Sequence, residues 1–95
     1  NTTLSYNISS WPADSWHHIA GTYGSSGVNL YINGTSVNST SSYSGFGLTA
    51  NETYIGGAWD STGDNIKWNL NGTIDQLIIW NKTLTATDIE QQFAL

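Results

Sequence analysis

The chain contains no cysteine and no methionine. Without cysteine it has no disulfide framework, no thiol chemistry and no Cys-ligated zinc site. It also lacks any run of about 18 apolar residues, so the sequence predicts no membrane-spanning helix. No secretory signal peptide is visible, which suggests a mature or excised piece.

Positive charge is almost as scarce. Lys67 and Lys82 are the only basic residues besides histidine, the net charge is −5, and only 9% of residues are charged. An ordinary soluble domain has roughly 25% charged residues. Because nucleic acids and anionic membranes are bound through basic patches, the composition argues against both partners.

Asparagine, serine and threonine replace the missing charges. The chain has ten Asn, and Ser plus Thr make up about a quarter of it, so chance predicts about two or three Asn-x-Ser/Thr sequons. The chain has seven, and one interpretation of this excess is that an Asn-, Ser- and Thr-rich composition produces sequons by chance. The other is a secreted or cell-surface domain whose N-glycans supply solubility. The seven sequons begin at Asn1, Asn7, Asn33, Asn38, Asn51, Asn71 and Asn81.

The first half of the chain predicts an antiparallel meander. Residues 15–23, 28–32 and 35–37 alternate like strands, and Asn33-Gly34 between the last two is typical of a type I′ turn. Residues 4–8 allow a short edge strand, followed by a turn over residues 10–14. The alternation predicts that Val28, Leu30 and Ile32 point inward and that Asn29 and Tyr31 point outward.

Residues 73–80 form the longest apolar run and predict the central strand of the fold. A strand that is apolar on both faces lies inside a sheet with something packed on each side. Alternation places Ile74, Gln76, Ile78 and Trp80 on one face, and Asp75, Leu77 and Ile79 on the other.

The remaining pattern predicts short strands at residues 52–56 and 66–70, a loop over residues 58–65, and a C-terminal helix. Thr85 fits the N-cap of that helix and Asp88 its third position, a capping box, while Leu84 can pack on Ile89. Ile89 and Phe93 share one face of the helix. Together these elements predict one all-β domain over residues 1–95, an antiparallel β-sandwich (jelly roll) with one short C-terminal helix.

An ordered set of motifs resembles the C-terminal half of the laminin G-like, concanavalin A-like jelly rolls, a group that includes pentraxin-type modules. The resemblance covers about residues 15–93. It is carried by Trp16-His17-His18-Ile19-Ala20-Gly21-Thr22-Tyr23, Leu30-Tyr31-Ile32-Asn33-Gly34, Tyr54-Ile55-Gly56-Gly57, Asn71-Gly72-Thr73-Ile74-Asp75-Gln76-Leu77-Ile78-Ile79-Trp80-Asn81 and Leu84-Thr85-Ala86-Thr87-Asp88-Ile89.

The resemblance implies that several strands would precede residue 15, and they are absent here. Partner strands from adjoining segments or from other copies of the chain would complete the sandwich, and a self-contained smaller sandwich is the alternative. The resemblance also implies a structural Ca²⁺ near Asp75, which matches the family's aspartate. Calcium takes six to eight oxygen ligands, so Asp75 alone makes no site, and backbone hydrogen bonding is its other role.

Other polar residues give no catalytic constellation. His17 and His18 are neighbours on a strand and so point to opposite faces, which favours structural roles. Asp60 and Asp64 lie in a predicted loop but lack the spacing of a helix–loop–helix calcium site. Glycoside hydrolysis needs two acids facing one groove. Glu90 is on the helix, and Glu52 has no acidic partner on its face.

The sequence therefore predicts a non-catalytic, N-glycosylated, secreted or cell-surface module for adhesion or structural assembly of a matrix or filament. The alternative is a carbohydrate-binding, lectin-like module, with or without calcium. In that case Trp59 and Tyr43, aromatic residues in predicted loops, would stack on sugar rings, although they can equally fill the ends of a sandwich.

Overall fold

The computed structural model describes residues 4–41, 55–60, 65–67 and 70–95. The chain divides into two units, Asn1–Gly45 with Trp80–Leu95, and Phe46–Ile79. In the described residues, no helix is long and apolar enough to cross a membrane.

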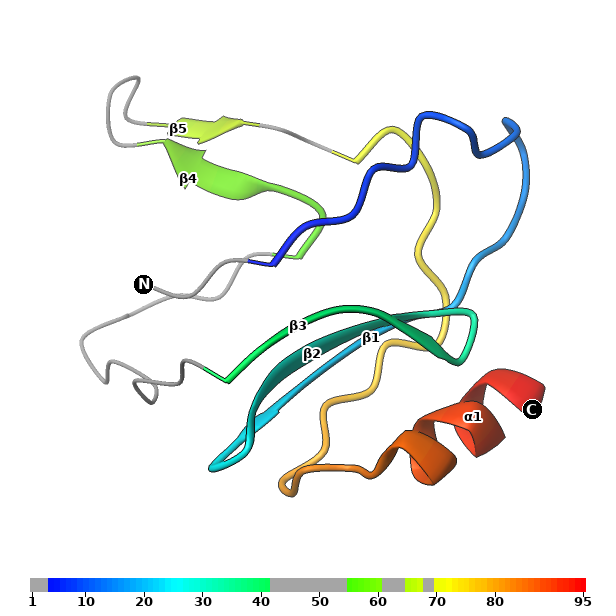
Figure 1. Cartoon of the computed structure of the whole chain (residues 1–95). Helices are drawn as coiled ribbons and strands as arrows, with labels where there is room; N and C mark the ends of the chain where they lie inside the picture. Colours follow the sequence, from blue (N-terminus) through cyan, green and yellow to red (C-terminus); the bar gives the residue numbers. More distant parts are fainter. Residues whose placement is uncertain (1–3, 42–54, 61–64, 68–69) are drawn as a thin grey trace. The chain divides into compact units, whose positions relative to one another are not determined.

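The first unit contains the predicted meander (Figure 1). Strands β1 (Ile19–Gly24), β2 (Gly27–Ile32) and β3 (Thr35–Thr40) form an antiparallel sheet in the order β1-β2-β3. Asn33 and Gly34 have φ angles of 50° and 80°, as a type I′ turn requires, so this part of the prediction is confirmed. The first strand begins at Ile19 rather than at Ser15. Residues 4–8 form no strand but lead into a turn in which the Trp11 N–H donates to the Ile8 carbonyl.

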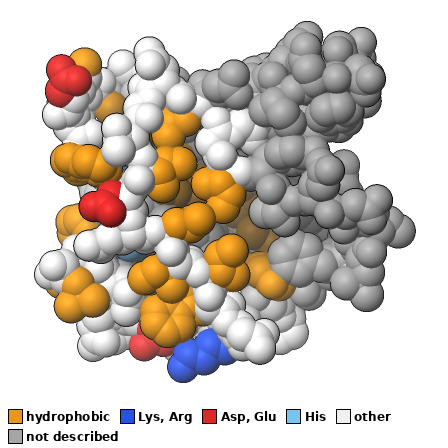
Figure 2. Space-filling model, turned by 180° about the vertical axis from the view of Figure 1, so that it is seen from behind, with side chains coloured by type: hydrophobic (Ala, Val, Ile, Leu, Met, Phe, Trp, Pro, Cys, Tyr) orange, Lys and Arg blue, Asp and Glu red, His pale blue; other side chains and the backbone are white. Residues whose placement is uncertain are grey.

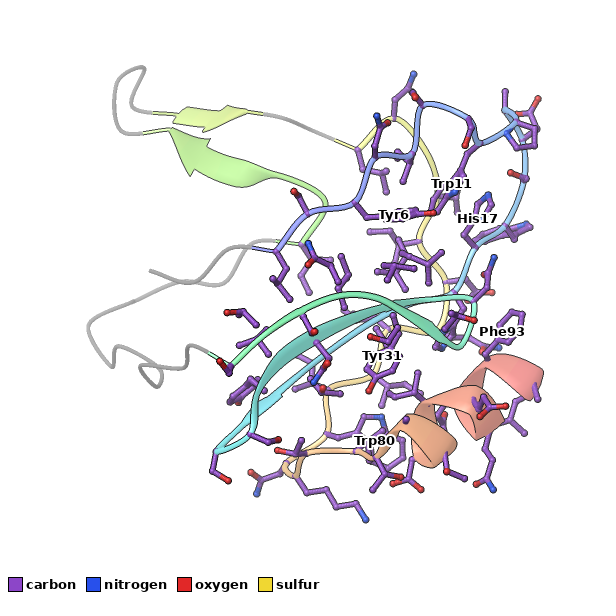
Figure 3. All side chains as sticks on the ribbon, viewed as in Figure 1. Tyr6, Trp11, His17, Tyr31, Trp80 and Phe93 are labelled. Carbon is purple, nitrogen blue, oxygen red and sulfur yellow. The ribbon has the colours of Figure 1, made fainter. Side chains whose placement is uncertain are left out.

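The prediction that Tyr31 points outward is wrong. Its side chain is only 6% exposed and points from the sheet towards helix α1 (Ala86–Ala94) (Figure 3). Tyr31, Leu84 and Ile89 form the buried core, and Ala20 packs against them. Alternation along β2 was predicted correctly, but it does not say which face the helix will cover.

The opposite face of the sheet, which we call the open face, is apolar and remains partly exposed. Cross-strand pairs in the β1–β2 register share a face. Ile19, at 62% exposure, and Tyr23, at 45%, are both exposed, and the apolar residues of β2 on this face are half-buried. The open face consists of Ile19, Tyr23, Val28, Leu30 and Ile32.

A bulge interrupts the pairing of β2 with β3. The register shifts between Leu30 and Tyr31, which pair with Asn38 and Ser36, so Val37 is the extra residue. Bulges of this kind increase the local twist of a strand.

Helix α1 begins as predicted. The Asp88 N–H donates to the Thr85 hydroxyl and the Thr85 N–H donates to an Asp88 carboxylate oxygen, both at 3.1 Å, which completes a capping box. Leu84, just before the cap, is buried with Ile89, as the predicted packing of this pair requires. The chain before the helix is tied to the sheet, because the Thr83 hydroxyl donates to the Tyr23 carbonyl oxygen at 2.6 Å.

The capping box makes the helix sensitive to acid. Hydrogen bonds from the Thr85 backbone and then its side chain hold the pKa of Asp88 below its ordinary 3.8. A carboxylate with a lowered pKa stabilises the fold above its unfolded pKa and loses that effect as pH falls through its folded pKa. We expect Asp88→Ala to lower the free energy of unfolding at neutral pH, because it removes the carboxylate that accepts the Thr85 N–H. The difference from the parent should shrink as urea unfolding is repeated at pH values below 3.8; an equal difference at every pH would contradict this assignment.

The second unit contains a small two-stranded ladder. Strands β4 (Ala58–Asp60) and β5 (Asn65–Lys67) are antiparallel, with Trp59 opposite Ile66. Residues 58–60 were predicted as loop, and that was wrong. The strand predicted at residues 66–70 is confirmed at residues 66–67, residues 68–69 lie outside the described part of the chain, and Leu70 belongs to no strand. Of the strand predicted at residues 52–56, residues 52–54 lie outside the described part of the chain, and residues 55–56 form bends.

Residues 73–80 do not form the predicted central strand. The structure assigns them no strand, and they take part in none of the ladders among the described residues. The backbone of Gln76 has φ 55°, a left-handed conformation that interrupts an extended segment. An interior strand needs a hydrogen-bonding neighbour on each side, and the described residues supply none for this segment.

Candidate functional site

The most distinctive surface of the described residues is the exposed apolar segment 73–80. Its large apolar side chains range from 46% exposed at Trp80 to 80% at Ile79. Single exposed apolar residues are ordinary, but a contiguous series of them marks an interaction site. In Figure 2, hydrophobic side chains are visible at the surface of the described residues. The exposed apolar members of the segment are Ile74, Leu77, Ile78, Ile79 and Trp80.

Asp75, the residue that the family resemblance implies as a calcium ligand, lies in this segment and is exposed. No group of three or more His, Cys, Asp or Glu side chains comes together in the described residues. The described part of the chain therefore does not bring two further carboxylate or imidazole ligands to Asp75. The calcium assignment stays a prediction.

The two histidines have separate surroundings, as predicted. The His17 ring stacks on Trp11 with 3.6 Å between the ring centroids and 10° between the planes, and its Nε2 lies 2.8 Å from the Ser15 hydroxyl (Figure 3). The His18 ring lies 5.9 Å from the ring of Phe93, measured between centroids. These contacts pack loops and the helix against the sheet and form no shared metal site.

The described sequons differ in what their asparagines do. Asn7, Asn71 and Asn81 are exposed, whereas Asn33 and Asn38 are partly buried. The Asn33 side-chain oxygen accepts the His18 N–H at 2.9 Å, and the Asn38 side-chain nitrogen donates to the Ser5 carbonyl at 2.8 Å. Sequence reasoning missed these bonds because their partners lie 15 and 33 residues away. The Asn-Gly turn was the one local signal that pointed to Asn33.

The other predicted site residues are only partly placed. Asn1, Asn51, Tyr43 and Asp64 lie outside the described residues. Trp59 and Asp60 belong to β4, where Asp60 pairs with Asn65. Glu90 lies on α1 and is exposed.

The comparisons with known proteins agree with the resemblance. The family model described as "Concanavalin A-like lectin/glucanases superfamily" (Laminin_G_3) matches residues 2–90. Among curated proteins, none matches the chain.

A solved structure is also similar. It is an S-layer domain-containing protein from Clostridium thermocellum, 28% identical, with a TM-score of 0.70. The match covers 98% of this chain and 42% of that one, so the chain spans less than half the length of its structural neighbour. Because the family model covers most of the sequence, the chain belongs to the concanavalin A-like lectin/glucanases superfamily.

Proposed function

We propose that this chain is a non-catalytic module of a cell-surface or secreted protein and that it serves structural assembly. Its contact segment is residues 73–80, which pairs with an extended segment of a second copy of the chain. The observation that carries the proposal is the exposure of this apolar segment, up to 80% at Ile79. In the described residues its backbone belongs to no strand ladder.

The physical case rests on two unmet requirements of this segment. Burying a Leu or Ile side chain fully is worth about 1.5–3 kcal/mol, so covering several of them would stabilise an assembly substantially. Among the described residues, its backbone N–H and C=O groups also belong to no ladder, and an added strand would pair with them. The open face of the β1–β3 sheet offers a further apolar surface that a partner would cover.

The proposal of a surface location has separate support. Seven sequons and a charge content of 9% suit a glycosylated protein outside the cell. The similar solved structure is that of an S-layer domain-containing protein. The proposal of a non-catalytic role rests on the sequence, in which Glu52 and Glu90 do not form a pair of acids facing one groove.

Self-association tests the proposal. We expect the purified chain to form higher-order species whose mass, measured by light scattering after size exclusion, increases with concentration. Ile79→Lys places a charge in the contact segment and should leave a monomer at every concentration. Gln91→Lys changes an exposed position of α1 and should associate like the parent.

Two results would contradict it. A parent chain that is monomeric throughout the concentration series would remove the assembly role. Equal association by the parent and by Ile79→Lys would move the contact elsewhere.

A carbohydrate-binding role is the second candidate. Trp16 is 69% exposed and Tyr6 47%, and exposed aromatic rings stack on sugars. A glycan array probed with and without a chelator separates the two functions. Specific binding that is lost in Trp16→Ala or Trp59→Ala would favour the lectin over the assembly module.

A further inference from the structure

We propose that the described sequons are divided by the fold: Asn33, Asn38 and Asn81 stay unmodified because their sequons bind the backbone, whereas Asn7 and Asn71 carry N-glycans. This inference rests on the proposed surface location, since it assumes that the chain meets a glycosylating enzyme. It adds which of the described sequons the enzyme modifies.

Asn33 has the most demanding structural role. Its N–H donates to the His18 carbonyl at 2.8 Å, while its side-chain oxygen accepts the His18 N–H at 2.9 Å. This pair of bonds, which we call the Asn33 clasp, closes the β2–β3 turn onto the residue just before β1. Because an amide group is planar, fixing its oxygen also fixes the direction of the nitrogen that would carry a glycan.

The surroundings of the clasp leave little room for a sugar. The neighbouring Gly34 lies under α1, since a Cβ built on it would be 3.1 Å from Phe93 Cδ2 and 3.6 Å from Glu90 Cα. The His18 ring contacts the same Phe93. Asn33 therefore lies where the turn, the residue before β1 and the helix meet, and it is partly buried. A bulky glycan there would compete with the packing of Phe93.

Asn38 and Asn81 are engaged in other ways. The Asn38 side-chain nitrogen, the atom that a glycan would use, donates to the Ser5 carbonyl, and its oxygen accepts the Ser39 N–H. Asn81 is exposed, but Thr83, the third residue of its sequon, donates its hydroxyl to the Tyr23 carbonyl. Modification of Asn38 or access to the Asn81 sequon would disturb a bond that ties distant parts of the chain together.

In the described part of the chain, neither Asn7 nor Asn71 bonds to a distant residue. Both are exposed. The side-chain oxygen of Asn7 accepts the N–H of Ser9, a local turn within its own sequon. Asn71 lies in a bend next to Gly72. A glycan on either residue can extend into solvent without breaking a bond between distant elements.

Glycopeptide mass spectrometry of the full chain, secreted from a host that glycosylates sequons, tests the division. We expect Asn7 and Asn71 to be occupied, and Asn33, Asn38 and Asn81 to be bare. Occupancy of Asn33 equal to that of Asn71 would overturn the proposal. If every sequon is bare, the division and the glycosylated location both fall, and the clasp itself is judged by the second measurement.

The second measurement uses unglycosylated chain. Asn33→Ala removes the side-chain bond of the clasp, from the His18 N–H to Asn33 Oδ1, and should lower the thermal unfolding midpoint by about 5–10 °C, as expected for a partly buried hydrogen bond in a small domain. Asn33→Asp keeps an acceptor and tolerates positive φ, so it should recover most of the loss. Asn71→Ala, the matched control, should leave the midpoint unchanged. Equal midpoints for Asn33→Ala and Asn71→Ala would refute the clasp independently of any glycan.

Discussion

Replacing Ile89 with alanine is expected to lower the free energy of unfolding by about 2–5 kcal/mol, a large share of the stability of a domain this small. Ile89 is 3% exposed, the least exposed residue of the described core, and it packs with Leu84 and Tyr31 between helix and sheet. Truncation leaves a cavity that few neighbours can fill, because the core is so small. The helix would lose its main anchor on the sheet.

Chemical denaturation followed by far-ultraviolet circular dichroism measures this effect. Gln91→Ala is the matched control, since it changes an exposed residue of the same helix to the best helix former and should be neutral or slightly stabilising. If Ile89→Ala unfolds at the same denaturant concentration as Gln91→Ala, α1 does not pack on the sheet as described.

Gly27→Ala should be at least as damaging, with an expected loss of about 3 kcal/mol or more from the backbone and steric terms together. Gly27 begins β2 with φ 119°, a conformation that side-chain-bearing residues rarely adopt. A Cβ there would collide with the Thr40 carbonyl oxygen and lie 3.0 Å from Ser41 Cα. Both are backbone atoms, which cannot rotate away as a side chain would.

Gly21→Ala provides the control within the same sheet. A Cβ at Gly21 meets only the Asn29 carbonyl oxygen, at 3.9 Å, an ordinary contact. We expect this variant to unfold within about 1 kcal/mol of the parent. Thermal melts of the two variants should therefore separate clearly. A Gly27→Ala melt that matches Gly21→Ala would contradict the described end of the β2–β3 pairing.

Signals confined to a few neighbouring residues predicted structure well. Asn33-Gly34 specified its turn because few residue pairs tolerate two positive φ angles. Thr85 and Asp88 specified the helix start because each satisfies a backbone N–H of the other within one turn. Neither needs information from distant parts of the chain.

Features set by distant partners were predicted less well. The alternating pattern correctly placed Tyr31 on the opposite face of β2 from Val28, Leu30 and Ile32. It did not show that α1 covers the face with Tyr31. Trp59 was assigned to a loop because its polar, glycine-rich neighbours suggested one, whereas pairing with Ile66 makes it part of a strand. The bond from Asn33 to His18 depends on the register of two strands, so no local pattern shows it.

The prediction of a central strand at residues 73–80 was wrong for a reason that bears on function. Its residues have high strand propensity, but a strand exists only where another chain segment accepts its hydrogen bonds. The segment has the composition of an interior strand, but the described residues include no neighbouring strand that pairs with it. This mismatch between sequence and surroundings is the basis of the assembly proposal.

Hydrogen exchange of the backbone amides of residues 73–80, measured by mass spectrometry on dilute and on concentrated chain, tests that proposal most directly. We expect rapid exchange in the dilute monomer and strong protection of the same amides in the higher-order species, while amides of β2 stay protected in both. Strong protection already present in the dilute monomer, or none in the assembled species, would contradict a contact segment that gains its partner only on assembly.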